Sequence, residues 1–301
     1  MEIDLPPPVT LLGRQREVRT LGEAVTAAPR DGAVLVLRGD PGVGKSALLE
    51  HAVRQVRGAG WAVLRTDGTP GERLLPLAAV HKLLRPVLAE TAGLSPTRRA
   101  ILDDAFGSAE RTVDVYGVAL ACLDLVSAVA ARRPVAVVVD DAHVLDAASV
   151  DVLTFVARRV SPDPVLLLVA TRSAGGDPFA EAGLPDLVLG PLDRPASEAL
   201  IDAAAPDLDP GLRPAVLALA EGNPLALLEL PLSLPRDPAG PARSGLIPLT
   251  GRLERAFAGR IAELPRVTRD LLLAAAVADT GSRLGLPPVE GDRSTTAGPR
   301  G

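Results

Sequence analysis

The sequence is poor in cysteine and in lysine, and each scarcity carries information. Its 301 residues include one cysteine, Cys122, so the chain cannot form an internal disulfide, and this usage fits an intracellular reducing compartment. Two lysines, Lys45 and Lys82, stand against 30 arginines, a bias typical of GC-rich coding. Because lysine is so rare, the place of each one in the sequence is informative.

The chain also lacks segments that direct a protein to a membrane. Its first ten residues, MEIDLPPPVT, show no basic stretch followed by an apolar one, so we expect no signal peptide. The longest apolar runs, such as LLLAAAVA (271–278), fall far short of the ~20 residues that span a bilayer. A formal net charge of −5 argues against a broad, non-specific nucleic-acid surface. We therefore expect a cytoplasmic protein with no membrane partner.

Short apolar runs alternate with segments of helical periodicity up to about residue 190. The apolar runs lie at 33–37, 61–66, 135–139, 165–170 and 186–190. Helical spacing occupies 45–58, most of 76–131 with a break at 91–97, and 147–160. Strands that are apolar throughout and alternate with helices predict a parallel sheet covered on both faces. The predicted fold class is α/β, with five parallel strands.

Residues 39–46 read GDPGVGKS and match the pattern G-x-x-x-x-G-K-[ST], between a predicted strand and a predicted helix. Glycines let such a loop turn tightly and point its N–H groups at phosphate oxygens, and the helix N-terminus adds its dipole. The lysine reaches the β- and γ-phosphates, and the serine hydroxyl ligates Mg²⁺. A chance match in a glycine-rich turn is disfavoured by the rarity of lysine. The loop predicts a site for ATP or ADP with Mg²⁺, formed by Gly39, Asp40, Pro41, Gly42, Val43, Gly44, Lys45 and Ser46.

Acidic residues follow the third apolar run, in VAVVVDDAHVLD (135–146). Asp140 comes at the carboxyl end of the predicted strand, where ligands bind in open α/β sheets, and is the candidate to hold Mg²⁺ with Ser46. Asp141 is the candidate to orient the attacking water. The alternative is that the pair only ends the strand or caps the next helix. Asp146 is most simply the N-cap of the helix over 147–160.

The fourth apolar run ends in Thr171 and Arg172. In P-loop ATPases with an extra strand between the P-loop strand and the strand that ends in the metal-binding aspartate, a polar residue at this point reads the γ-phosphate. Arg172, a permanently charged donor, is the candidate for that role, and a surface arginine after a strand is the alternative.

The ordered segments LLGRQREVRTL (11–21), GDPGVGKS, VVVDDAHVLD, VATRS and EGNPLAL (221–227) resemble the STAND class of signalling AAA-type ATPases. The closest likeness is to the nucleotide-binding module of actinobacterial ATP-binding LuxR-type transcriptional regulators. The resemblance implies that Gly13 and Arg14 pack by the adenine, and that Gly222 and Pro224 belong to a lid whose proline touches the base or ribose. It further implies a switch that rests with ADP and assembles with itself or a protein partner in the ATP state.

The resemblance covers about residues 9–278 and gives the expected organisation. The expected parts are a flexible N-terminus (1–8), a P-loop ATPase domain (9–190), a helical lid (191–230), a linker (231–246), the helical start of a winged-helix-like module (247–280) and a disordered tail (281–301). The family's helical-repeat sensor and helix-turn-helix reader are missing, so the sequence suggests a truncated regulator that does not bind DNA directly.

Other P-loop classes fit less well. A GTPase reads guanine through N/T-K-x-D, and the one spare lysine, Lys82, lies in HKLL. The sequence has only a poor, misplaced echo of the ABC signature, and no arginine between Ser173 and Asp193 for the finger of a ring-forming motor. No arginine-rich lid of a small-molecule kinase is evident. Two hypotheses stay open. The first is a slowly hydrolysing ATP switch. The second is a nucleotide-binding or interaction module without useful turnover, or a decayed fragment, and a stand-alone AAA-like ATPase is the further alternative.

Overall fold

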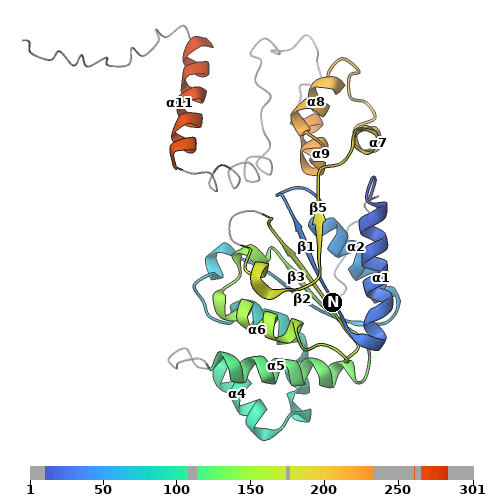
Figure 1. Cartoon of the computed structure of the whole chain (residues 1–301), viewed down its shortest axis with the longest axis vertical. Helices are drawn as coiled ribbons and strands as arrows, with labels where there is room; N and C mark the ends of the chain where they lie inside the picture. Colours follow the sequence, from blue (N-terminus) through green and yellow to red (C-terminus); the bar gives the residue numbers. More distant parts are fainter. Residues whose placement is uncertain (1–10, 108–113, 174–176, 234–260, 262–265, 284–301) are drawn as a thin grey trace, which may run out of the picture. The chain divides into compact units, whose positions relative to one another are not determined.

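The computed structural model describes residues 11–107, 114–173, 177–233, 261 and 266–283. The chain separates into two compact units, Met1–Glu254 and Arg255–Gly301. The first unit carries the sheet and the candidate site. Among the described residues, the second unit carries helix α11, Arg266–Arg283 (Figure 1).

Five parallel strands form one sheet at the centre of the first unit (Figure 1). The strands are β1 (Ala33–Gly39), β2 (Ala62–Asp67), β3 (Val135–Asp140), β4 (Val165–Thr171) and β5 (Asp186–Leu189). Their order across the sheet is β2-β3-β4-β1-β5. The predicted α/β class with five parallel strands is therefore confirmed. Strand β4 lies between the P-loop strand β1 and the strand β3 that ends in Asp140, which is the arrangement that the expectation for Arg172 required.

The register brings the candidate residues to one edge of the sheet. Arg38 of β1 pairs with Thr171 of β4, and Asp67 of β2 pairs with Asp140 of β3. Because the strands are parallel, their carboxyl ends meet at the same edge. The P-loop, the acidic pair and Arg172 therefore start from neighbouring strand ends, although they are far apart in the sequence.

The position of a strand in the sheet explains its pattern of apolar and polar residues. Every residue of β3 and β4 is buried, because helices cover both faces of these strands, and both are apolar almost throughout. Strand β5 lies at an edge, and its residues alternate between exposed and buried, with Val188 64% exposed. The expectation of continuously buried strands thus holds for the centre of the sheet and is wrong for this edge.

Two groups of helices cover the two faces (Figure 1). Helices α1 (Gln15–Asp31) and α2 (Lys45–Gly58) pack on one face. Helix α1 was not predicted from the sequence, although Leu21, Val25 and Ala28 are spaced as one helical face and are buried. The other face carries the remaining helices of the sheet region, which are α3 (Ala78–Leu84), α4 (Pro96–Gly107), α5 (Val115–Ala130) and α6 (Ala147–Ala157).

The segment predicted as largely helical over 76–131 is divided into several pieces. After α3 the chain continues as a 3₁₀ helix, η2 (Arg85–Gly93), and α4 begins at Pro96. The predicted break near 91–97 therefore falls where η2 gives way to α4. Shorter 3₁₀ turns are η1 (Pro70–Glu72), η3 (Ala142–Val144) and η4 (Ala180–Ala182).

Three helices follow the sheet and are called here the α7–α9 segment. They are α7 (Arg194–Ala204), α8 (Arg213–Ala220) and α9 (Pro224–Ser233). The backbone N–H of Leu192 donates to the carbonyl of Gly222 over 2.8 Å, so the chain re-approaches its starting point after α7 and α8. Helix α9 continues past residue 230, into the stretch expected as a linker.

The second unit contains helix α11 (Arg266–Arg283), where the sequence predicted a helix over 266–278. Helix α11 also takes in the start of the expected tail. Most of the expected helix over 249–263 and of the linker, the rest of the tail and the N-terminus lie outside the described residues. None of the described helices is long and apolar enough to cross a membrane.

Candidate functional site

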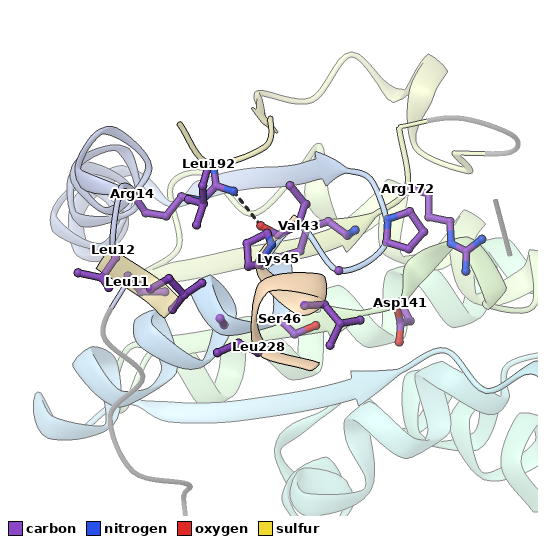
Figure 2. A pocket seen from close by; sticks show the side chains of 17 residues that line it. Leu11, Leu12, Arg14, Val43, Lys45, Ser46, Asp141, Arg172, Leu192 and Leu228 are labelled. Carbon is purple, nitrogen blue, oxygen red and sulfur yellow. Dashed lines mark hydrogen bonds between the residues drawn. The ribbon is translucent and has the colours of Figure 1, made fainter. Parts of the chain in front are cut away.

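A pocket of about 320 Å³ opens at the carboxyl edge of the sheet, where the P-loop meets the α7–α9 segment (Figure 2). Its lining consists of Leu11, Leu12, Arg14, Pro41, Gly42, Val43, Gly44, Lys45, Ser46, Ala47, Asp141, Arg172, Leu192, Leu200, Pro224, Leu225 and Leu228. The sequence-predicted P-loop, one aspartate, two arginines and the lid proline therefore share one cavity. Five predicted residues are not part of this lining, although they contact residues close to it: Gly13, Gly39, Asp40, Asp140 and Gly222.

The P-loop backbone is shaped by two glycines with positive φ. Gly42 has φ +79° and Gly44, the N-cap of α2, has φ +105°, conformations that side chains with a Cβ rarely adopt. Helix α2 begins at Lys45, and the N–H groups of a first helical turn have no partner within the helix. The loop thus offers backbone donors and the positive end of a helix to an anion in the pocket.

Lys45 is largely buried and folds back onto the loop that precedes it. Its Nζ donates to the carbonyl oxygens of Gly39, at 2.8 Å, and Asp40, at 3.0 Å. An ammonium group carries three protons, so one donor direction is left over from these two bonds. Burial lowers the pKa of the Lys45 ammonium, while the carboxylates of Asp141 and Asp140 act in the opposite direction.

Asp140 ends β3 and contacts the start of α2. The Ser46 hydroxyl donates to Asp140 Oδ1 over 3.2 Å, and the backbone N–H of Asp141 donates to the same oxygen over 2.9 Å. Burial raises the pKa of the Asp140 carboxyl, and the charge of Asp141 raises it further. A buried carboxylate of this kind is stabilised by a cation, and the two oxygen donors are of the type that Mg²⁺ prefers. These residues fit a Mg²⁺ ion bound together with a nucleotide phosphate.

Asp141 and Arg172 both reach the pocket from neighbouring strand ends (Figure 2). Asp141 is exposed and has φ +46°, so the chain turns sharply after Asp140. Arg172 is half-buried, directly after the fully buried Thr171. Both residues interact electrostatically with Lys45, Asp141 favouring its charged form and Arg172 disfavouring it. The arrangement offers one acidic group and two basic groups on one side of the pocket.

Arg14 lines the pocket, but its guanidinium group binds protein oxygens. Nη2 donates to the carbonyl of Val43 over 2.9 Å (Figure 2). It also donates to the carbonyl of Gly190 over 2.8 Å, and Nη1 pairs with Glu17 over 3.3 Å. Arg14 therefore connects the P-loop to the end of β5. A Cβ placed on its neighbour Gly13 would collide with Ala196 of α7, so this glycine permits close packing of the α7–α9 segment.

The opposite wall of the pocket is apolar and was not predicted from the sequence, Pro224 excepted. Leu11 and Leu12 precede the glycine–arginine pair, and Leu225 and Leu228 share one face of α9. Helical spacing within α9 could have suggested that face, but nothing in the sequence indicates which face of α9 the P-loop contacts. Together with Leu192 and Leu200 these residues form a surface suited to a flat aromatic ring.

Gly222 and Asn223 join the α7–α9 segment to the sheet. A Cβ on Gly222 would collide with the carbonyl oxygen of Leu192, which explains the small residue. The side-chain amide of Asn223 donates to the carbonyl of Pro41 over 2.9 Å. Gly222 and Pro224 were predicted as site residues from the sequence, whereas the contact of Asn223 with the P-loop was not predicted.

Comparison with known proteins agrees with the fold. The chain is 29% identical over 254 residues to an uncharacterised protein of Rhizobium meliloti (strain 1021), an alignment that covers 73% of the chain and 24% of that protein. The chain thus spans about a quarter of the length of this relative.

Among solved structures, the chain is similar to a Walker-type ATPase of Pyrococcus abyssi, with a TM-score of 0.50, 14% identity, and 91% of this chain and 76% of that one covered. A Signal Transduction ATPase with Numerous Domains (STAND) protein of Pyrococcus horikoshii, which has a tetratricopeptide repeat sensor, is similar with a TM-score of 0.49, 18% identity, and 90% and 35% covered. The family described as the AAA ATPase domain matches residues 10–169, more than half of the chain. The chain therefore belongs to the AAA ATPase domain family.

Proposed function

We propose that the chain is an ATP-binding switch module that hydrolyses ATP slowly, of the STAND type and from a LuxR-type regulator. The observation that carries the proposal is the shared pocket, in which the P-loop, the acidic strand end, Arg172 and the α7–α9 segment converge. The order of motifs along the sequence supports the STAND and LuxR-type assignment.

The polar side of the pocket supports a role in phosphate binding. In the proposal, the loop backbone and Lys45 bind the β- and γ-phosphates, and Arg172 contacts the γ-phosphate. Ser46 and Asp140 hold Mg²⁺, which neutralises charge on the phosphate oxygens when it is bound. Asp141 orients the attacking water. Because aspartate is one methylene shorter than the glutamate found in many ATPases, we expect slow turnover.

The apolar side supports binding of the base. Pro224, Leu225 and Leu228 line the pocket together with Leu11 and Leu12, and a purine ring can be buried against such a surface. Gly13 and Arg14 support this wall indirectly, since Arg14 holds the P-loop and Gly13 admits α7. Gly222 lets the chain pass close to Leu192 just before Pro224, because it has no Cβ. The nucleotide is therefore proposed to be bounded on one side by the sheet and on the other by the α7–α9 segment, which acts as the lid.

Regulation is proposed to follow from that position. A lid that closes over the nucleotide responds to whether a γ-phosphate and Mg²⁺ are present, as in other nucleotide switches. In the ATP-bound form the chain would then engage a protein partner or a second copy of itself.

Phosphate release by the purified protein tests this function. We expect slow, Mg²⁺-dependent release that falls to background in Lys45→Ala and Asp140→Ala. Lys82→Ala is the matched control, because Lys82 is the chain's other lysine and pairs with Asp67. Nucleotide at ~100 times its dissociation constant should stabilise the wild type by about 2.7 kcal/mol.

Two results would change the proposal. Nucleotide binding without phosphate release above background, and without any effect of Asp141→Ala, would leave a binding module and remove the hydrolysis step. If neither ATP nor ADP shifts the melting temperature, the proposal that the chain binds a nucleotide is refuted as well.

A further inference from the structure

Both the oxygen and the nitrogen of the Asn223 side-chain amide form hydrogen bonds. Its Oδ1 accepts from the backbone N–H groups of Leu225, at 3.0 Å, and Ala226, at 3.3 Å, and so caps the start of α9. Its Nδ2 donates to the carbonyl oxygen of Pro41 over 2.9 Å. One residue therefore ends the turn between α8 and α9, caps α9 and binds Pro41 of the P-loop, which lies 182 positions earlier in the chain.

The backbone of α9 adds a second bond to the same loop. The N–H of Leu225 donates to the carbonyl of Gly42 over 3.2 Å. A Cβ on Gly42 would lie 2.7 Å from Asn223 Oδ1 and 2.8 Å from Leu225 Cβ, closer than such atoms normally approach. The absence of a side chain at Gly42 thus allows α9 to reach the loop.

These bonds complete a series that fixes the carbonyl groups of the P-loop. Lys45 holds the carbonyls of Gly39 and Asp40, and Arg14 holds that of Val43. Asn223 and the Leu225 N–H hold the two between them, those of Pro41 and Gly42. All five consecutive carbonyls therefore have a donor, and two of the donors come from the start of α9, its cap Asn223 and Leu225.

The direction of a carbonyl fixes the direction of the next N–H. The peptide group is planar and trans, so the carbonyl of Pro41 and the N–H of Gly42 point in opposite directions. A carbonyl of Pro41 held toward α9 thus turns the N–H of Gly42 away from α9. Release of that carbonyl lets the peptide rotate, and the donor that a phosphate oxygen would meet loses its fixed direction.

We propose that Asn223 is a positioning residue that orients the P-loop for phosphate binding and makes nucleotide affinity depend on docking of α9. The inference rests on the proposed nucleotide-binding function. It assigns to Asn223 an effect on the bound nucleotide through Pro41, beyond its capping of α9.

Asn223→Asp separates the two roles of the amide. The aspartate keeps the oxygen that caps α9, and its charge suits a helix N-terminus. It loses the donor to Pro41 and places a carboxylate oxygen opposite a carbonyl oxygen. Asp193→Asn is the matched control, because Asp193 caps α7 in the same segment through the N–H of Ala196, over 2.8 Å. This exchange alters a cap elsewhere in the α7–α9 segment and leaves Asn223 and Pro41 unchanged.

The measurement is the rate at which a fluorescent ADP analogue leaves the full chain when chased with excess ADP. We expect about tenfold faster release from Asn223→Asp, the size of one well-placed hydrogen bond. Release from Asp193→Asn should match the wild type. The melting temperature of the nucleotide-free Asn223→Asp protein should fall only by the few degrees that one lost hydrogen bond costs, because the cap is retained. In turnover, KM for ATP should rise while kcat at saturating ATP is retained.

Asn223→Ser provides a second variant, since serine caps a helix well but is too short to reach Pro41. It should release the analogue as fast as Asn223→Asp does. Release at the wild-type rate from either variant, with normal binding by the wild type, would overturn the inference and leave the proposed function intact. Failure of the wild type to bind the analogue would overturn both.

Discussion

Substitution of Arg14 tests how the P-loop is held, because the motif resemblance and the structure assign this residue different roles. The resemblance implies that Arg14 packs by the adenine. In the structure its guanidinium binds the carbonyls of Val43 and Gly190, and its side chain is 7% exposed. If those bonds dominate, Arg14 stabilises the protein even when no nucleotide is present.

The size of the effect follows from the groups left behind. Arg14→Met keeps most of the apolar stem and removes the guanidinium, so that packing changes little. Two carbonyl oxygens then lose charged donors, each bond being worth about 1.5–3 kcal/mol. Glu17, 14% exposed at its side chain, also loses its partner. Some of this loss is recovered when water or small shifts satisfy the carbonyls, and we expect the free energy of unfolding to fall by about 3 kcal/mol.

Denaturant unfolding of nucleotide-free protein measures this loss, with the fluorescence of the single tryptophan, Trp61, as the signal. Arg16→Met is the control, because Arg16 is exposed in the first turn of α1, two residues after Arg14. Its free energy of unfolding should stay within about 0.5 kcal/mol of the wild type. A difference equally small for Arg14→Met, together with weaker ADP binding, would refute the structural role and favour direct contact with the nucleotide.

The remaining predictions concern two buried residues away from the pocket, Asp146 and Cys122. Asp146 accepts hydrogen bonds from three backbone N–H groups, those of Leu77, Ala79 and Ser149. In urea unfolding, Asp146→Ala should lower the free energy of unfolding by about 3 kcal/mol, and Asp146→Asn should lower it less. Equal losses for the two variants would contradict this. Burial raises the pKa of the Cys122 thiol to about 12, so the native thiol should resist Ellman's reagent at pH 8, and rapid labelling would contradict the burial. Above pH 9 the unfolded chain loses the thiol proton first; the free energy of unfolding should therefore fall with rising pH, by at most about 1.4 kcal/mol per unit, and Cys122→Ala should reduce that slope.

Local chemistry made the P-loop and the strand ends predictable. GDPGVGKS constrains its own backbone, and a buried apolar run that ends in aspartate places that residue at a known edge of the sheet. Asp146 was predicted as the cap of α6, and its bond to the Ser149 N–H confirms it. Its bonds to Leu77 and Ala79 were not predictable, because they join segments that are distant in the sequence.

The same limit applies to the contacts that shape the pocket. Arg14 reaches Val43 and Gly190, which lie 29 and 176 positions away, and no local pattern reports such a pairing. Asn223 has one local partner set, in α9, and one distant partner, Pro41. From the sequence only its capping role was accessible. Tertiary packing adds distant partners to such side chains, and the local sequence does not report them.

The bond between Leu192 and Gly222 has a mechanical consequence. Because it joins the chain on either side of α7 and α8, tension applied beyond Ser233 can pass through α9 to the sheet without stretching those two helices. The load then falls on the few bonds at the start of α9, and the Asn223–Pro41 bond is among them. A pull on the end of α9 would therefore load the bond between Asn223 and the P-loop rather than α7 and α8.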